Sequence, residues 1–308
     1  MAPKIRTSRY APLALFVYNR PGHTRQTIEA LLANTVANQT PLHVFSDAPR
    51  NEAASLAVTE VRSYIRNIAG FKSVTIFERE TNFGLARSII DGVTGLCDEY
   101  GSVIVMEDDL VTSPYFLKFM NEGLDLYARD ERVISIHGYV YPVMEALPET
   151  FFLRGADCWG WATWKRGWDL FEPDGQSLLQ ELKARKLTHR FDFDAAHPYL
   201  RMLKNQIKGK NNSWAIRWYA SAFLKDKLTL YPGRSLVLNI GTDNSGAHCS
   251  TTTVFSGEVA DSPITIVPIS VEENECARQQ IIKFHRAARR LTPIRVLRKL
   301  ANMVQRAR

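Results

Sequence analysis

Three adjacent acids, Glu107-Asp108-Asp109, follow directly on the apolar run Ser102–Met106. A nucleoside diphosphate becomes a good leaving group when a divalent cation neutralises its developing charge. Mg²⁺ and Mn²⁺ prefer oxygen ligands and take one or two carboxylates from a protein, while phosphates and water fill the remaining positions. Neighbouring side chains at a strand end point to opposite sides, so Asp109 would hold the metal while Asp108 reaches ribose hydroxyls. The alternative is that the triplet caps the next helix and interacts with its dipole.

Short apolar runs alternate with longer amphipathic segments through the first half of the chain. The expected strands are Leu13–Tyr18, Leu42–Ser46, Ser73–Phe77 and Ser102–Met106. The expected helices are His23–Ala33, Glu52–Ala69, Gly84–Cys97 and Tyr115–Leu126. This alternation predicts βαβ units, an α/β fold and a mainly parallel central sheet.

Polar residues follow each of these strands. Asn19, Asp47, Asn82 and the acidic triplet all come just after an apolar run. Ligands of open α/β sheets bind outside the carboxyl ends of the strands. The sequence therefore predicts one binding site that gathers these residues.

The second half of the chain is less regular. Val133–His137 and Leu228–Tyr231 are expected strands, and Asn239–Cys249 is a loop rich in Gly, Asn and Ser. Four tryptophans fall between Asp157 and Trp168. They are interpreted either as a platform for a sugar ring or as core packing, because aromatic rings do both.

The net charge of +7 is concentrated at the C-terminus. Residues Lys283–Arg308 carry nine Lys or Arg and no acid, and the remaining chain carries 30 basic and 32 acidic residues. Nucleic-acid binding by the body is therefore poorly supported. The basic tail either contacts anionic lipid or is solvated. No secretory signal or membrane span is apparent, so a cytoplasmic protein is expected, with peripheral contact to the inner face of the membrane as the hypothesis for the tail.

Several segments resemble a known family when taken in order. They are Leu13–Pro21, Asn82–Ala86, Val105–Leu110, Trp159–Trp164, Arg217–Ser221 and Asn239–Cys249. These resemble bacterial glycosyltransferases of the family-two-like, GT-A type, and the Glu-Asp-Asp triplet is also similar to that of N-acetylglucosaminyltransferase I. The resemblance covers most of the chain and implies a GT-A, Rossmann-like fold. It divides the chain into a catalytic domain over 1–282, with a nucleotide-binding half at about 11–130 and an acceptor half at about 131–282, and a tail over 283–308.

The resemblance also implies a role for each matching residue. The nucleotide pocket would be lined by Asn19, Arg20, Pro21, Asp47, Asn82, Gly84 and Asp108. Asp109 and His248 would serve the Mn²⁺ or Mg²⁺ ion, and Glu107 would face the donor sugar. Relatives carry an acidic general base in the stretch that corresponds to Ser213–Arg217, where this chain has no carboxylate. Asp157 and Asp243 are the substitutes.

The function that this resemblance implies is inverting transfer of a sugar from a nucleotide diphosphate sugar, with UDP as the expected nucleotide. The acceptor would be a glycan or a lipid-linked glycan of surface polysaccharide synthesis. Two alternatives stay open. One is a non-catalytic carbohydrate- or membrane-binding protein, and the other is a nucleotidyltransferase that makes sugar nucleotides.

Overall fold

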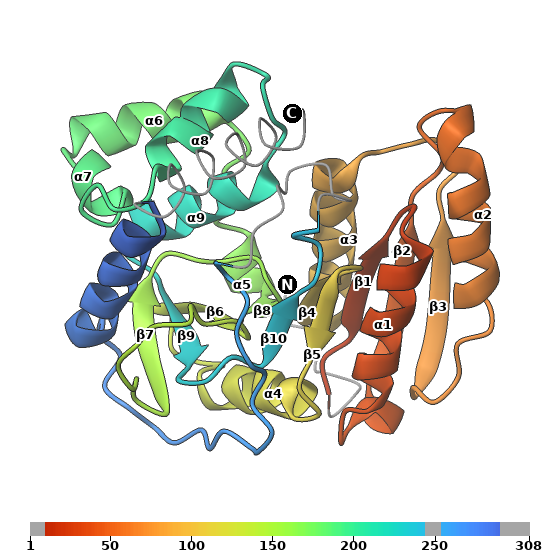
Figure 1. Cartoon of the computed structure of the whole chain (residues 1–308). Coiled ribbons are helices and arrows are strands. Elements are labelled where there is room, and N and C mark those ends of the chain that lie inside the picture. Colours follow the sequence, from red (N-terminus) through yellow and green to blue (C-terminus); the bar gives the residue numbers. More distant parts are fainter. Residues whose placement is uncertain (1–9, 244–253, 290–308) are drawn as a thin grey trace, which may run out of the picture.

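The computed structural model describes residues 10–243 and 254–289 (Figure 1). The first half contains β1 (Leu13–Val17), α1 (Pro21–Leu32), η1 (Ala37–Gln39), β2 (Pro41–Ser46), α2 (Glu52–Ile65), β3 (Ser73–Glu78), α3 (Leu85–Tyr100), β4 (Ser102–Glu107), β5 (Leu110–Thr112) and α4 (Phe116–Leu126). The second half contains β6 (Val133–His137), β7 (Thr150–Arg154), β8 (Trp161–Trp164), α5 (Lys165–Trp168), α6 (Gly175–Ala184), α7 (Thr188–Phe191), α8 (Tyr199–Ile207), α9 (Trp214–Leu224), β9 (Leu228–Pro232) and β10 (Val237–Asn239). A further helix covers residues 275–289.

Eight strands form one sheet in the order β3-β2-β1-β4-β8-β6-β9-β7. Within the described residues, four of its seven pairings are parallel and join β3 to β2, β2 to β1, β1 to β4, and β6 to β9. Strands β8 and β7 run antiparallel to their neighbours. The predicted α/β class with a mainly parallel sheet is confirmed, and the antiparallel strands were not foreseen.

Successive side chains of the central strands point to opposite faces of the sheet and belong to two separate apolar cores. Leu13, Leu15 and Val17 of β1 pack with α1, α2 and α4 on one face of the sheet. Ala14 and Phe16 point to the other face, where α3 and α9 cover them. A strand buried on both faces reads as a continuous apolar run, which is why β1 and β4 could be predicted from sequence.

Local residue choices fix the helix ends around the sheet. Pro21 occupies the first turn of α1, where its missing N–H would have no partner. Gly101 ends α3 in a left-handed conformation with φ of 78°. Ser213 caps α9 by accepting a hydrogen bond from the amide of Ile216.

The tryptophan cluster is core rather than a surface platform. Trp161, Trp164 and Trp168 are buried, and Trp161 stacks on Trp214 with ring centroids 5.5 Å apart. Trp159 is only partly buried and packs edge-to-face on Tyr139. Of the two interpretations of this cluster, core packing therefore holds for the three buried rings.

The helix at 275–289 packs on the outer side of the second half, where it is coloured blue in Figure 1. Its residues Ala277, Ile281 and Ile282 join the apolar cluster formed by α6 to α9, and His285 is buried as well. The boundary drawn between residues 282 and 283 therefore falls inside one packed helix. No helix among the described residues combines the length and apolar character needed to cross a bilayer.

Candidate functional site

The carboxyl ends of β1 and β4 lie side by side at the point where the strand order reverses. The chain runs outward from β1 to β2 and β3, then returns through α3 to place β4 on the other side of β1. Phe16 of β1 is the register partner of Glu107 of β4, so the β1–α1 turn and the acidic triplet share one edge. Such a switch point is where open α/β sheets bind their ligands.

Arg20 ties the two strand ends together. Its guanidinium pairs with the Asp108 carboxylate and lies 2.9 Å from Oδ2 of Asp109. Burial opposes the charge on Arg20, but the two carboxylates outweigh it and raise the arginine pKa above its usual range. Asn19 and Pro21, its neighbours in the turn, are partly exposed. The structure thus brings the predicted residues of the β1–α1 turn to the acidic triplet.

Asp108 is held by the main chain as well as by Arg20. Its Oδ2 accepts a hydrogen bond from the amide of Tyr18 at 3.2 Å. Its carbonyl oxygen accepts one from the hydroxyl of Thr27 in α1 at 2.9 Å. Burial is the largest influence on the Asp108 carboxyl and raises its pKa. These contacts fix the position of the triplet relative to α1.

Asp109 lies beneath the segment that follows β10. The amide of Ile240 donates to the Asp109 carbonyl oxygen at 2.9 Å. A Cβ placed on Gly241 would lie 2.0 Å from Asp109 Oδ2. Only glycine therefore permits the main chain to approach the carboxylate this closely.

Glu107 is the partly buried first member of the triplet. Burial raises its pKa to about 8, with repulsion from Asp109 and Asp108 as the next contributions, while Arg20 acts in the opposite direction. Among the described residues, Arg20 is the cation that pairs with the triplet, through Asp108 and Asp109. Burial and repulsion between the carboxyl groups both favour the protonated form of Glu107.

Asp47 and Asn82 organise the loop on the other side of β1. The Asp47 carboxylate accepts hydrogen bonds from the amides of Phe83 and Gly84, each at 2.8 Å. The Asn82 amide donates to the carbonyl oxygen of Ala48 at 2.6 Å. Gly84 has φ of 72°, a conformation that glycine adopts without strain. In the structure these residues hold a loop beside the switch point, and their predicted contact with a nucleotide stays a prediction.

Asp157 lies on the loop that crosses from β7 to β8. One of its carboxylate oxygens accepts a hydrogen bond from the amide of Cys158 at 2.8 Å, and the other lies 3.7 Å from Nε2 of the fully buried His137. Burial is the largest cause that raises the pKa of the Cys158 thiol, and the charges of Asp157, Glu107 and Asp109 raise it further. Trp161, three residues further on, is the register partner of Val105 in β4, so this loop runs toward the end of β4 that carries the acidic triplet.

Asp243 occupies a more open position. Its Oδ2 lies 3.2 Å from Nε2 of His23 in α1, and about half of its side chain (49%) is exposed. It comes two residues after Gly241 and so belongs to the rim above Asp109. His248 lies outside the described residues.

A cavity of about 80 Å³ opens next to Asp157. Its walls are loop 154–158, the start of α9, the segment 193–202, Tyr141 and Tyr231. Ala215 and Ile216 of α9 line it, so these two residues of the stretch 213–217 face the same space as Asp157. Sequence reasoning missed the cavity because its wall residues come from five separate segments.

Three other contributors were also missed by sequence reasoning. They are the bridging role of Arg20, the close approach of Gly241 and the placement of Cys158. For Gly241 a signal was present, because a glycine in a loop after a short apolar run favours a close main-chain approach. Among the described residues, no group of three or more His, Cys, Asp or Glu side chains is arranged to hold a metal on its own.

No protein-family model and no curated protein matches the chain. Solved structures similar to part of it include the mannosyltransferase PcManGT from Pyrobaculum calidifontis in complex with GDP-Man and Mn²⁺, with 12% identity and a TM-score of 0.30 over 45% of this chain and 38% of that one. Mouse xyloside xylosyltransferase 1, apo form, has 15% identity and a TM-score of 0.29, and the match covers 42% of this chain and 55% of that one. Glucosyl-3-phosphoglycerate synthase from Mycobacterium tuberculosis, in complex with Mn²⁺, UDP-Glc and phosphoglyceric acid, has 9% identity and a TM-score of 0.30. The match covers 52% of this chain and 58% of that one. The matches span less than two thirds of each of these proteins, and TM-scores this low carry no argument about fold or activity.

Proposed function

We propose that the protein is a GT-A-type glycosyltransferase that binds a nucleotide diphosphate sugar at the β1/β4 switch point. The observation that carries the proposal is the position of Glu107-Asp108-Asp109, which ends β4 directly beside the turn after β1. Arg20 is the only cation that the described ion pairs place on this triplet. Open α/β sheets bind ligands outside the carboxyl ends of their strands at such a switch point, and a pyrophosphate bound there would need nearby cations.

A divalent cation fits this site in charge and in donor chemistry. With all three carboxyl groups ionised, the triplet would exceed Arg20 by two negative charges, and burial together with repulsion from Asp109 and Asp108 raises the pKa of Glu107. Asp109 would provide the carboxylate ligand, with phosphates and water as the other ligands, which is common for Mg²⁺ and Mn²⁺. When bound, the ion would stabilise the charge that develops on the departing diphosphate. Arg20 would then pair with Asp108 and with a phosphate oxygen.

Asp157 is the better of the two candidates for the general base. It borders the cavity next to Cys158, which lies close to Glu107 and Asp109. Ala215 lines the opposite wall of that cavity, at the position where the resemblance leads one to expect an acid. In an inverting displacement, the acceptor hydroxyl attacks the anomeric carbon, Asp157 takes its proton and the diphosphate leaves. Asp243, paired with His23 at the rim, is the second candidate.

The product and location of the enzyme belong to the same proposal. A glycan or lipid-linked acceptor of surface polysaccharide synthesis would suit a catalytic body with a basic C-terminal segment. That segment would dock on anionic lipid at the inner face of the membrane, where each Lys or Arg contributes on the order of 1 kcal/mol.

A thermal-shift panel tests the central claim. UDP, GDP, dTDP and CDP are each added to the full chain with and without Mn²⁺. One nucleoside diphosphate is expected to raise the melting temperature, and more so with Mn²⁺. Hydrolysis of the matching nucleotide sugar then separates an enzyme from a binding protein. If none of the four shifts the melting temperature, the proposal is wrong.

A further inference from the structure

We infer, on the premise of the proposed transferase activity, that the cavity beside Asp157 receives the acceptor and that the group it accepts is an uncharged sugar ring. A phosphate or carboxylate would be excluded. Three features of the cavity carry this inference: its charge, its hydroxyl groups and its fixed outer wall.

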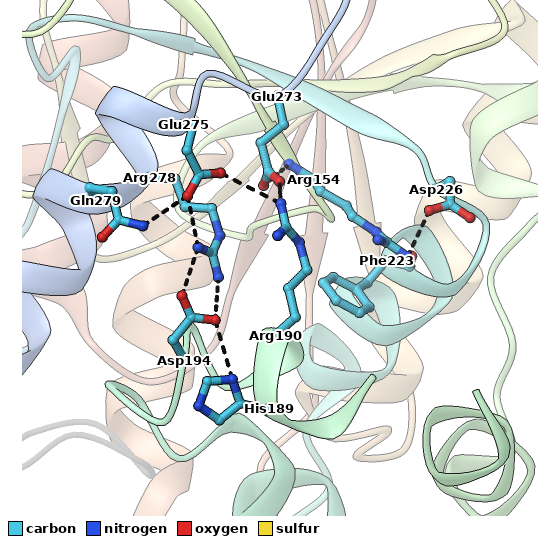
Figure 2. Close-up of polar contacts among 10 residues, drawn as sticks. All are labelled: Arg154, His189, Arg190, Asp194, Phe223, Asp226, Glu273, Glu275, Arg278 and Gln279. Carbon is cyan, nitrogen blue, oxygen red and sulfur yellow. Dashed lines mark hydrogen bonds and ion pairs between the residues drawn. The ribbon is translucent and has the colours of Figure 1, made fainter. Parts of the chain in front are cut away.

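The charge of the cavity is negative. Asp157 contributes a carboxylate, and the loop that carries it leads into Trp161, the register partner of Val105 near the acidic end of β4. Among the described residues that line the cavity, Arg154 is the one cationic side chain. Its Nε donates to the carbonyl oxygen of Phe223 at 3.0 Å, and a terminal nitrogen lies 2.7 Å from Asp226 (Figure 2). Because Arg154 is already neutralised, an anionic acceptor group would meet a carboxylate without a compensating cation.

Phenolic hydroxyls supply neutral hydrogen-bonding groups. The hydroxyls of Tyr141 and Tyr199 lie 3.2 Å apart, and when one donates to the other, the second still has a proton to give. Burial is the largest cause that raises the pKa of both phenols, so both keep their protons at neutral pH. The hydroxyl of Tyr219 is bonded to Phe191, which leaves its ring as an apolar wall. Phenols that donate and a carboxylate that accepts match the hydroxyls of a sugar.

The outer wall of the cavity is held in a strained turn. Phe193, Asp194 and Ala195 have φ of 48°, 53° and 60°, which is rare for residues other than glycine. Asp194 accepts two hydrogen bonds from Arg278 of helix 275–289, at 2.8 and 2.9 Å, as Figure 2 shows. This pair holds the turn and so places Phe193 against the cavity. Strain of this kind persists only where surrounding contacts impose it.

Nearby ion pairs also hold this turn in place. Arg190 of α7 pairs with Glu273, and Glu275 also accepts from Arg278 (Figure 2). Because both sides of the turn are anchored, the cavity has a defined size. At about 80 Å³ the cavity has room for on the order of six water molecules, and thus for one edge of a sugar ring.

Ligand-observed NMR on the full chain tests the inference without depending on turnover. Saturation transfer is measured for methyl β-glucoside and methyl N-acetyl-β-glucosaminide against glucose 6-phosphate and methyl β-glucuronide, with the nucleoside diphosphate present. At least one neutral glycoside is expected to bind about tenfold more tightly than either anion. Equal or tighter binding of an anion overturns the inference, and so does the absence of binding by both neutral glycosides.

Variants locate the binding. Ala215→Leu fills the cavity and is expected to reduce neutral-glycoside binding at least fivefold, whereas Ala184→Leu, on the exposed side of α6, leaves it unchanged. Asp157→Asn keeps the shape of the site but removes its charge. It is expected to reduce the difference in affinity between neutral and anionic ligands. Binding unaffected by Ala215→Leu places the sugar elsewhere and overturns the inference. Failure of the proposed function would appear separately, as the absence of any nucleoside diphosphate shift.

Discussion

The guanidinium of Arg20 lies 2.9 Å from Asp109 Oδ2, and the same group also pairs with Asp108. One side chain from the turn after β1 therefore neutralises part of a carboxylate cluster at the end of β4. Any ligand that brings a divalent cation to Asp109 must share this carboxylate with Arg20. The two cations are thus expected to compete for, or jointly hold, the same acidic group.

Replacement of Arg20 by methionine is expected to destabilise the protein by about 3 kcal/mol, because it leaves two buried carboxylates without their partner. Urea denaturation measures the change. Mn²⁺ should restore part of the lost stability in Arg20→Met and have a smaller effect on the wild type. Arg25→Met, in the helix that follows Arg20 and away from the triplet, is the control. A stability of Arg20→Met that does not respond to Mn²⁺ would contradict the proposed metal site.

Asp109→Ala is expected to abolish the Mn²⁺ dependence of the nucleoside diphosphate thermal shift. The shift without metal should persist, because Asp108 and Arg20 remain. Glu122→Ala, on the partly exposed side of α4, serves as the matched loss of one carboxylate. If Asp109→Ala retains the full metal effect, the ligand assignment is wrong.

Gly241→Ala should block the site without unfolding the protein. The added methyl group would lie 2.0 Å from Asp109 Oδ2, so either the carboxylate or the segment after β10 must move. We expect nucleotide affinity to fall at least tenfold by isothermal titration calorimetry. Gly22→Ala is the control, since a Cβ there meets nothing within 4 Å. Equal affinity in both variants would show that the segment after β10 does not border the nucleotide.

Asp157→Asn is expected to reduce the rate of sugar transfer by a factor of about 10² to 10⁴, the usual contribution of a general base. The nucleoside diphosphate thermal shift should stay unchanged, because the described ion pairs of Arg20 are with Asp108 and Asp109. Asp243→Asn is measured in parallel. If Asp243→Asn causes the larger loss of rate, the base is the residue at the rim instead.

Stability should fall as the solution becomes acidic, through His197 and His285. Burial lowers the pKa of His197 to about 4 and that of His285 to about 3, and the centroids of their tilted rings lie 4.5 Å apart. Because the unfolded chain takes up these protons near pH 6.5 and the folded chain does not, stability is full above pH 6.5 and declines toward pH 4. At pH 5, each histidine lowers the free energy of unfolding by roughly 2 kcal/mol relative to its value above pH 6.5.

Urea denaturation at pH 7 and pH 5 checks this dependence. His285→Phe should lose less stability between the two pH values than the wild type. His189→Gln is the control, because 72% of that side chain is exposed. An identical pH response in His285→Phe and the wild type would exclude the buried pair as the cause.

The first half of the chain could be predicted from sequence because its central strands β1, β2 and β4 are buried on both faces. β1 and β4 are continuous apolar runs, and their ends carry Asn19 and the acidic triplet at the predicted edge. The helix expected to extend to Ala69 ends at Ile65, since a turn and then Gly70, with φ of 101°, follow. Boundaries of this kind depend on turn geometry, which apolar periodicity does not report.

The second half of the chain could not be predicted in the same way. β8 consists of Trp161–Trp164 and pairs antiparallel between β4 and β6, a placement that no local pattern encodes. The cavity beside Asp157 depends on contacts between residues more than fifty positions apart, such as Tyr141 with Tyr199. Only the folded chain reveals such a meeting of distant segments.

The pairing of Asp194 with Arg278 has a practical consequence for shortening the chain. A version that stops at residue 274 would keep every strand of the sheet and every acid of the triplet, yet it would release the turn that carries Phe193. It is expected to bind nucleotide normally while losing selectivity between sugars. Trimming for crystallisation or expression should therefore begin after residue 289, and the last described helix should be retained.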